Sequence, residues 1–384
     1  MTVRFSLARG LGAVAVLGAG VELGSCRTGA APAPIGPAEP SADLEHVTDA
    51  TRRAYLRQAQ VWRPIRTASL DLAAGPDLPG RFPPGASVAC DFFDDGKPLT
   101  GMTPKFLCKA GDDVFKVKYG EGNGEVYAET AASRLFWALG FGADGVYPVE
   151  VTCRGCPVDP WLWRTTLRQK ARTYSSATIE RKFEGEAIAS KSAAGWDWGE
   201  LDLVDSAAGG APLAHRDALK LLAVLVQHGD NKPSQQRLVC LPGGVRRGGS
   251  GLRCDRPFLI VSDLGATFGG AGDLSRGGKA KMNFAQWSSK RVFKDAASCV
   301  GDLDGSIIGS LQDPAIREAG RRFLAERLAL LSEAQIRALF VAARAGDRGE
   351  TIQSEGVRRA VTVDDWVQAF KDKRAEIAER RCPS

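Results

Sequence analysis

One short polar segment combines residue types that could perform chemistry. In "QHGDNKPSQQ", His228, Asp230 and Lys232 are spaced two apart, and Gln235 follows three residues later. An Asp can accept the proton of a hydroxyl group, and a nearby Lys can offset negative charge that develops during a reaction. The segment therefore predicts either a catalytic loop or, as the simpler alternative, a polar turn that ends a buried helix.

A second carboxylate lies one predicted hairpin further along the chain. "QRLVCL" and "PFLIVSDLG" are typical of two paired strands, and the second strand runs into Asp263. Carboxylate oxygens are the ligands that Mg²⁺ and Mn²⁺ prefer. Asp263 is therefore a candidate metal ligand, and the alternative is a turn in which it caps its own backbone.

Earlier in the chain, lysines and glutamates lie on two neighbouring predicted elements. "DVFKVKYG" predicts a strand in which Lys116 and Lys118 share one face, because side-chain direction alternates along a strand. The helix predicted after it, "GEVYAETAASRLFWALG", carries Glu125 and Glu129 four residues apart on one face. A strand Lys could thus pair with a helix Glu. The alternative is that both lysines are solvated on a half-buried strand.

The surrounding elements follow from hydrophobic pattern and turn residues. A helix is predicted over residues 48–61, and "SVACDFFDD", "PKFLCKA" and "DVFKVKYG" predict three strands. The Glu-bearing helix follows, and "VYPVEVTC" predicts a further strand. Together these elements form a small α+β unit.

The later part of the chain is predicted to be mainly helical. Pro212 opens "PLAHRDALKLLAVLVQ", a helix that is apolar on most sides and ends at the polar segment. "EAGRRFLAERLALL" and "EAQIRALFVAARA" predict amphipathic helices. Within the less regular region 159–210, a helix is predicted near residues 178–183.

In this order, the motifs resemble the protein-kinase-like superfamily. "HGDNKPSQ" is similar to the catalytic loop H-R-D-L-x-x-x-N, "SDLG" stands where D-F-G belongs, and "FKVKYG" stands where the nucleotide-contacting Lys strand belongs. The arrangement is closer to HipA-type and secretory-pathway kinases than to eukaryotic protein kinases, and it covers roughly residues 88–345. It implies an α+β bilobal fold, with a small strand-rich N-lobe over 48–160, a larger, mainly helical C-lobe over 161–384, and a hinge within 159–210.

The resemblance also implies a role for each candidate residue and a set of ligands. By that resemblance the roles are catalysis for Asp230 and Lys232, metal binding for Asp263 and Gln235, and binding of nucleotide phosphates for Lys118 with Glu129, or for Lys116 as second candidate. The expected cofactor is ATP, or another nucleotide, with Mg²⁺ or Mn²⁺. The expected substrate is a hydroxyl-bearing protein or glycan of unknown identity.

Two departures from the family pattern affect these expectations. Gln235 stands where the family has a metal-binding Asn, and Gln236 is an alternative one position later. The glycine-rich phosphate loop is reduced to Gly96 and Gly101. The sequence therefore predicts a kinase-like phosphotransferase, with a pseudokinase that serves as an envelope binding or scaffold protein as the alternative.

The N-terminus predicts export. "MTVRFSLARGLGAVAVLGAGVELGSC" has the basic start, short apolar stretch and small residues of a signal peptide over residues 1–25. "LGSC" resembles a bacterial lipobox in which Cys26 is lipidated, and an Ala/Pro-rich tether follows over 26–47. A plain signal peptide is the alternative. We expect a lipoprotein of the bacterial cell envelope that faces the periplasm and contacts the membrane only through its lipid.

Composition and cysteines fit this location. The 384 residues carry a net charge of +6 without long basic runs, which argues against a nucleic-acid-binding protein. Apart from Cys26, eight cysteines remain, an even number that predicts disulfides in an oxidising compartment. Cys240 and Cys254 bracket a glycine-rich loop that a disulfide could close. Cys153 and Cys156 predict a structural disulfide, with half of a zinc site or a redox pair as alternatives.

Overall fold

The computed structural model describes the chain from residue 36 to residue 383, with gaps. Within that range it leaves out residues 37, 98, 100, 102, 162–166, 250, 271–280, 296, 304–307 and 355. The predicted signal peptide and Cys26 lie outside the described residues.

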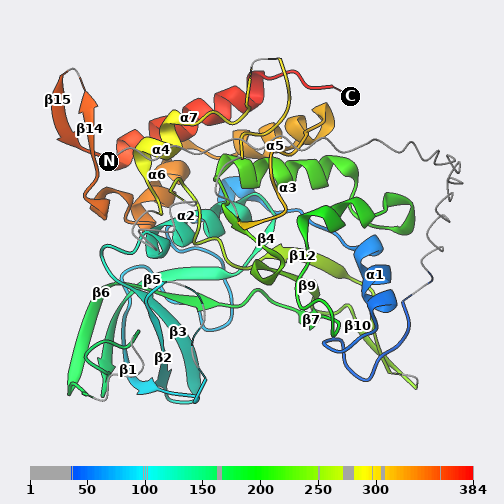
Figure 1. The fold of residues 1–384 in the computed structure, drawn as a ribbon, viewed down its shortest axis with the longest axis horizontal. Coiled ribbons are helices and arrows are strands. Elements are labelled where there is room, and N and C mark those ends of the chain that lie inside the picture. Colours follow the sequence, from blue (N-terminus) through cyan, green and yellow to red (C-terminus); the bar gives the residue numbers. More distant parts are fainter. Residues whose placement is uncertain are drawn as a thin grey trace, which may run out of the picture. The chain divides into compact units, whose positions relative to one another are not determined.

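A closed five-stranded barrel forms the first part of the fold (Figure 1). Its strands, in spatial order, are β1 (Ser87–Phe93), β2 (Lys105–Ala110), β3 (Asp113–Tyr119), β6 (Ala171–Arg181) and β5 (Gly145–Arg154). Only the β1–β5 contact is parallel; the other pairs are antiparallel. The interior holds buried side chains that include Phe106, Val117 and Ile179. Because side chains alternate along a strand, the residues next to these point outward.

The helix predicted near residues 178–183 is wrong, because this segment belongs to strand β6. β6 pairs with β3 on one side and β5 on the other, and it completes the barrel. Ala177 and Ile179 are fully buried inside the barrel, which requires the alternation of a strand. Pairing on both sides therefore decides the conformation, and the barrel extends past residue 160 into the region where a hinge was expected.

Helix α2 (Glu125–Ala138) is buried on nearly all sides. It packs against β3, β5 and β6 of the barrel and against helix α6 (Glu333–Ala342). At its N-terminus the Asn123 side chain accepts a hydrogen bond from the Glu125 amide at 3.2 Å. Beyond its C-terminus Gly140 has φ +89°, and a Cβ there would lie 2.4 Å from the Arg63 carbonyl oxygen.

A second, four-stranded sheet carries the predicted hairpin strands. Its spatial order is β4 (Gly142–Ala143), β12 (Pro257–Val261), β9 (Gln236–Cys240) and β7 (Glu186–Ile188). β9 and β12 are antiparallel, as the sequence predicts. The connection between them forms a small hairpin of its own, made of β10 (Val245–Gly248) and β11 (Gly251–Cys254).

The remaining elements are mainly helical, so the fold is a mixed α+β fold, as expected. α3 (Leu213–Leu225) packs on α5 (Glu318–Ala329), and α7 (Val363–Glu379) packs on α4 (Phe284–Ser289), α5 and α6. α1 (Asp49–Gln58) lies within the helix predicted near the start of the chain. Two short strand pairs complete the structure: β8 (Asp230–Asn231) with β13 (Ile308–Gly309), and β14 (Thr351–Ser354) with β15 (Val357–Ala360). Among the described residues, no helix is both long and apolar enough to span a membrane.

All eight cysteines of the described chain form disulfides. The pairs are Cys90–Cys108, Cys153–Cys156, Cys240–Cys254 and Cys299–Cys382. The predicted bridges at 240–254 and 153–156 are thus confirmed. Because both sulfurs of the 153–156 pair are bonded to each other, this pair does not form half of a zinc site.

Candidate active site

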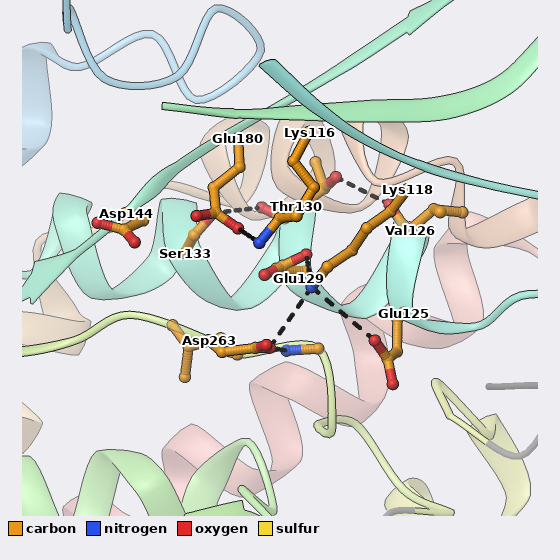
Figure 2. A network of polar contacts seen from close by, with 12 residues as sticks. Lys116, Lys118, Glu125, Val126, Glu129, Thr130, Ser133, Asp144, Glu180 and Asp263 are labelled. Carbon is orange, nitrogen blue, oxygen red and sulfur yellow. Dashed lines mark hydrogen bonds and ion pairs between the residues drawn. The ribbon is translucent and has the colours of Figure 1, made fainter. Parts of the chain in front are cut away.

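A buried lysine on β3 lies at the centre of a carboxylate cluster (Figure 2). The Lys118 ammonium donates to Glu129 Oε2 at 2.8 Å and lies 3.5 Å from Asp263 Oδ1 and 3.8 Å from Glu125 Oε2. The side chain of Lys118 is 3% exposed and that of Glu129 is 1% exposed. These residues come from β3, α2 and the end of β12. The structure thus brings the preferred lysine, the preferred glutamate and the candidate metal ligand together, and Lys118 is buried rather than solvated.

The charged groups in this cluster change one another's pKa values. Burial disfavours the charged form of Lys118, but Asp263, Glu129 and Glu125 outweigh it and raise its pKa well above the usual value. Burial likewise opposes ionisation of Asp263, but Lys118 and Lys116 hold its pKa below the usual range. Burial raises the pKa of Glu129, while the Lys118 ammonium opposes this shift and Asp263 adds to it. Asp263 therefore stays ionised at neutral pH.

Lys116, the second candidate for the nucleotide phosphates, has a different partner. Its ammonium lies 2.7 Å from Glu180 Oε2 on β6 (Figure 2). Burial opposes the ionisation of Glu180, but Lys116 and Lys182 lower its pKa to about 2. Lys182 also pairs with the fully buried Asp144 at 3.0 Å. Lys116 therefore borders the cluster from a second ion-pair network.

The polar segment that follows α3 holds its Asp by two side chains. Lys232 Nζ donates to both carboxylate oxygens of Asp230, at 2.8 and 2.7 Å, and Gln235 Nε2 donates to Oδ2 at 3.0 Å. Asn231 is fully buried and donates to the carbonyls of His228 and Leu311 at 3.1 and 3.2 Å. The segment is thus a fixed loop and not a freely solvated turn.

His228 and Gln236 are structural members of this loop. His228 is fully buried, its two ring nitrogens have no hydrogen-bond partner among the described residues, and its ring packs near Trp198. Gln236 is 1% exposed and donates to the Asn231 carbonyl at 2.8 Å. The Gln236 side chain therefore lies inside the protein and supports the loop, whereas the Gln235 side chain lines the cleft described next.

The two loops border a common cleft. The Gln235 carbonyl accepts hydrogen bonds from the amides of Ser262 and Asp263, at 2.8 and 3.2 Å, which fixes one loop against the other. The cleft is open to solvent and has about 1120 Å³ of space between its walls. Its charged and polar walls are lined by Thr103, Lys105, Lys116, Glu125, Glu180, Lys182, Asp230, Lys232, Ser234, Gln235, Ser262 and Asp263. Lys118 and Glu129 lie behind this wall and reach it through Asp263.

Three charged residues that line the cleft, Lys105, Glu180 and Lys182, were missed from sequence. Lys105 opens the strand predicted from "PKFLCKA", but its face depends on the register with β3. Glu180 and Lys182 both lie in the segment that was predicted to be helical; Glu180 is in β6, and Lys182 directly follows this strand. A strand assignment there, with Ile179 inside, would have placed Glu180 on the outer face.

The side-chain oxygens of Asp263 and Gln235 are of the chemical type that binds divalent cations. Asp263 Oδ1 accepts from the Gly265 amide at 3.0 Å, so the residue does cap its own turn, as the simpler alternative predicted. Asp263 Oδ2 and Gln235 Oε1 accept no hydrogen bond from any described residue. Within the described chain no group of three or more His, Cys, Asp or Glu side chains is arranged for a metal. The Asp263 carboxylate and the Gln235 amide thus each have one oxygen of the kind that Mg²⁺ prefers.

Comparisons with known proteins include a distant structural likeness. No protein-family model matches the chain, and no curated protein matches it. Among solved structures, the chain is similar to CtkA, a proinflammatory kinase of Helicobacter pylori, at 11% identity and a TM-score of 0.38, over 76% of this chain and 94% of that chain. This is a distant kinase-like relationship at most, so the function proposed below rests on the site itself.

The buried His228 predicts acid sensitivity. Burial lowers the pKa of His228 to about 4, so the unfolded chain takes up this proton near pH 6.5 and the folded chain does so only near pH 4. Stability is therefore lost as the pH falls between these values, by roughly 3 kcal/mol. Urea unfolding at several pH values should show that the free energy of unfolding falls less steeply with decreasing pH for His228→Gln than for the wild type. His46→Gln, at an exposed position, is the control. Equal slopes for wild type and His228→Gln would contradict the prediction.

Proposed function

We propose that this protein is a kinase-like phosphotransferase that moves a phosphate from a nucleotide to a hydroxyl of a protein or glycan. The observation that carries the proposal is the convergence of Lys118, Glu129 and Asp263 beside a cleft that Asp230 also lines. Phosphoryl transfer depends on positioning and charge neutralisation, which such an arrangement supplies.

Each side chain has a defined task in this proposal. The acceptor hydroxyl attacks the terminal phosphorus, the bond from phosphorus to the leaving nucleotide oxygen breaks, and Asp230 accepts the hydroxyl proton. Lys232, now paired with Asp230, neutralises charge on the transferred phosphate. Lys118, held by Glu129, contacts the nucleotide phosphates. Asp263 and Gln235 would hold Mg²⁺ or Mn²⁺, which would offset the negative charge of the phosphates.

A pseudokinase is the second candidate, and one observation favours it. Both carboxylate oxygens of Asp230 are engaged by Lys232, and one of them also by Gln235, the residue in the family's Asn position. If these contacts persist with nucleotide bound, Asp230 cannot accept a proton readily. The cleft would then bind a ligand without transfer, as an envelope binding or scaffold protein would.

Binding of nucleotide and metal is the first expected property. Ligand that binds only the folded state raises stability by about 2.7 kcal/mol at 100 times its dissociation constant. We expect ATP with Mn²⁺ to raise the melting temperature by roughly 2–4 °C. Asp263→Asn, which removes the charge of the candidate metal ligand, should lose most of this shift. Absence of a shift in the wild type at millimolar nucleotide, or an equal shift in Asp263→Asn, would argue against the proposal.

Transfer of phosphate separates the two candidates. With labelled ATP and either the chain itself or a generic protein or glycan as acceptor, the wild type should transfer the terminal phosphate. Asp230→Asn should lose at least about 100-fold in rate, because a positioned base typically contributes 10²–10⁴-fold, while it keeps its thermal shift. A wild type that binds nucleotide and transfers no faster than Asp230→Asn would support the pseudokinase.

We further propose that the protein is exported and anchored through Cys26. The four disulfides are consistent with an oxidising compartment. In bacteria that process lipoproteins, Cys26→Ser should move the protein from the membrane fraction to the soluble fraction. An unchanged distribution would refute the anchor.

A further inference from the structure

One of the lysines that line the cleft has no carboxylate partner among the described residues. The other three have one: Lys116 pairs with Glu180, Lys182 with Asp144, and Lys232 with Asp230. Lys118, behind the wall, pairs with Glu129. Lys105 forms no ion pair and no side-chain hydrogen bond with any described residue, and its ammonium lies 5.5 Å from the ring centre of Trp161.

The sheet register places this lysine against another positive charge. Lys105 on β2 is the direct cross-strand partner of Lys118 on β3. Like charges directly opposite each other destabilise a sheet. Partial burial and the proximity of Lys118 and Lys116 lower the pKa of Lys105, because each disfavours its charged form. An anion bound at this point would relieve the repulsion.

The connection between β1 and β2 borders the cleft beside Lys105. Gly101 and Thr103 of this connection line the cleft together with Lys105. Gly101 has φ +94°, and a Cβ at this position would lie 2.9 Å from the Lys105 ammonium. The backbone of this connection therefore approaches the ammonium closely, at the edge of a cleft that is open to solvent. In kinases the corresponding connection is the glycine-rich loop whose backbone covers the phosphates, and this chain lacks that glycine pattern.

We propose that Lys105 binds a phosphate group of the nucleotide beyond the α-phosphate and takes over part of the task of the missing glycine-rich loop. The inference rests on the proposed function, since Asp263 and Lys118 are the groups that would hold the metal and the neighbouring phosphate. An ammonium group has three N–H donors that can bind phosphate oxygens. The Lys105 ammonium forms no ion pair with a described carboxylate, so its charge is available for this contact. Free inorganic phosphate offers the same chemistry, so the test includes it.

Lys105→Met tests this contact, with Lys109→Met as matched control. Lys109 lies on the same strand, four residues on, and is exposed outside the cleft. Calorimetric titrations with ATP and Mn²⁺, AMP, and inorganic phosphate are compared for the wild type and both variants. We expect Lys105→Met to weaken ATP binding by about 10- to 100-fold, the range of a hydrogen bond to a charged group, and Lys109→Met to match the wild type. The unliganded melting temperature of Lys105→Met should not fall, because a like-charge pair is removed.

The outcomes separate this inference from the proposed function. Equal ATP affinity in Lys105→Met and wild type would overturn the contact and leave the proposed function standing. If the wild type binds inorganic phosphate through Lys105 but does not bind ATP, the phosphate contact is supported. The proposal that the ligand is a nucleotide is then contradicted. A drop in AMP affinity equal to the drop for ATP, or a lowered melting temperature without ligand, would assign Lys105 a structural role and overturn the inference.

Discussion

The burial of one ammonium group is the constraint on which the site depends. A charge removed from water is tolerated only when it is paired and hydrogen-bonded. Lys118 meets this requirement with Glu129 at 2.8 Å, and its other two carboxylate neighbours lie at longer range. These partners come from helix α2 and from the end of β12, so the ion pairs fix both elements against the barrel. The same contacts keep Asp263 ionised at the edge of the cleft.

The loop after α3 reaches this cluster through backbone contacts and buried polar side chains. Asn231 and Gln236 use their amides inside the protein, which leaves Asp230 and Gln235 at the surface of the cleft. The Gln235 carbonyl then binds the amides at the end of β12. A rigid support of this kind is what phosphoryl transfer requires, because the barrier is lowered mainly by holding groups in position.

Sequence patterns predicted the local part of this arrangement. The alternation in β3 placed Lys116 and Lys118 on one face, and helical spacing placed Glu125 and Glu129 on one face. The sequence could not decide which Lys meets which Glu, because that depends on how α2 packs on the barrel. Residues 178–181 were misjudged for a related reason: their strand conformation is set by the pairing of β6 with β3 and β5, not by local preference. The position of Lys105 at the cleft follows from the β2–β3 register, which the sequence does not determine. The disulfide between Cys299 and Cys382 joins residues 83 apart in sequence, so the sequence alone could not predict it.

Diffraction from crystals with Mn²⁺ and a non-hydrolysable ATP analogue tests the central claim most directly. We expect an anomalous manganese peak bonded to Asp263 and next to Gln235, with nucleotide phosphates in contact with Lys118 and Lys105. We also expect the side of the terminal phosphate that the acceptor hydroxyl attacks to face Asp230. Manganese or nucleotide bound elsewhere, or a cleft that stays empty at saturating concentrations, would contradict it.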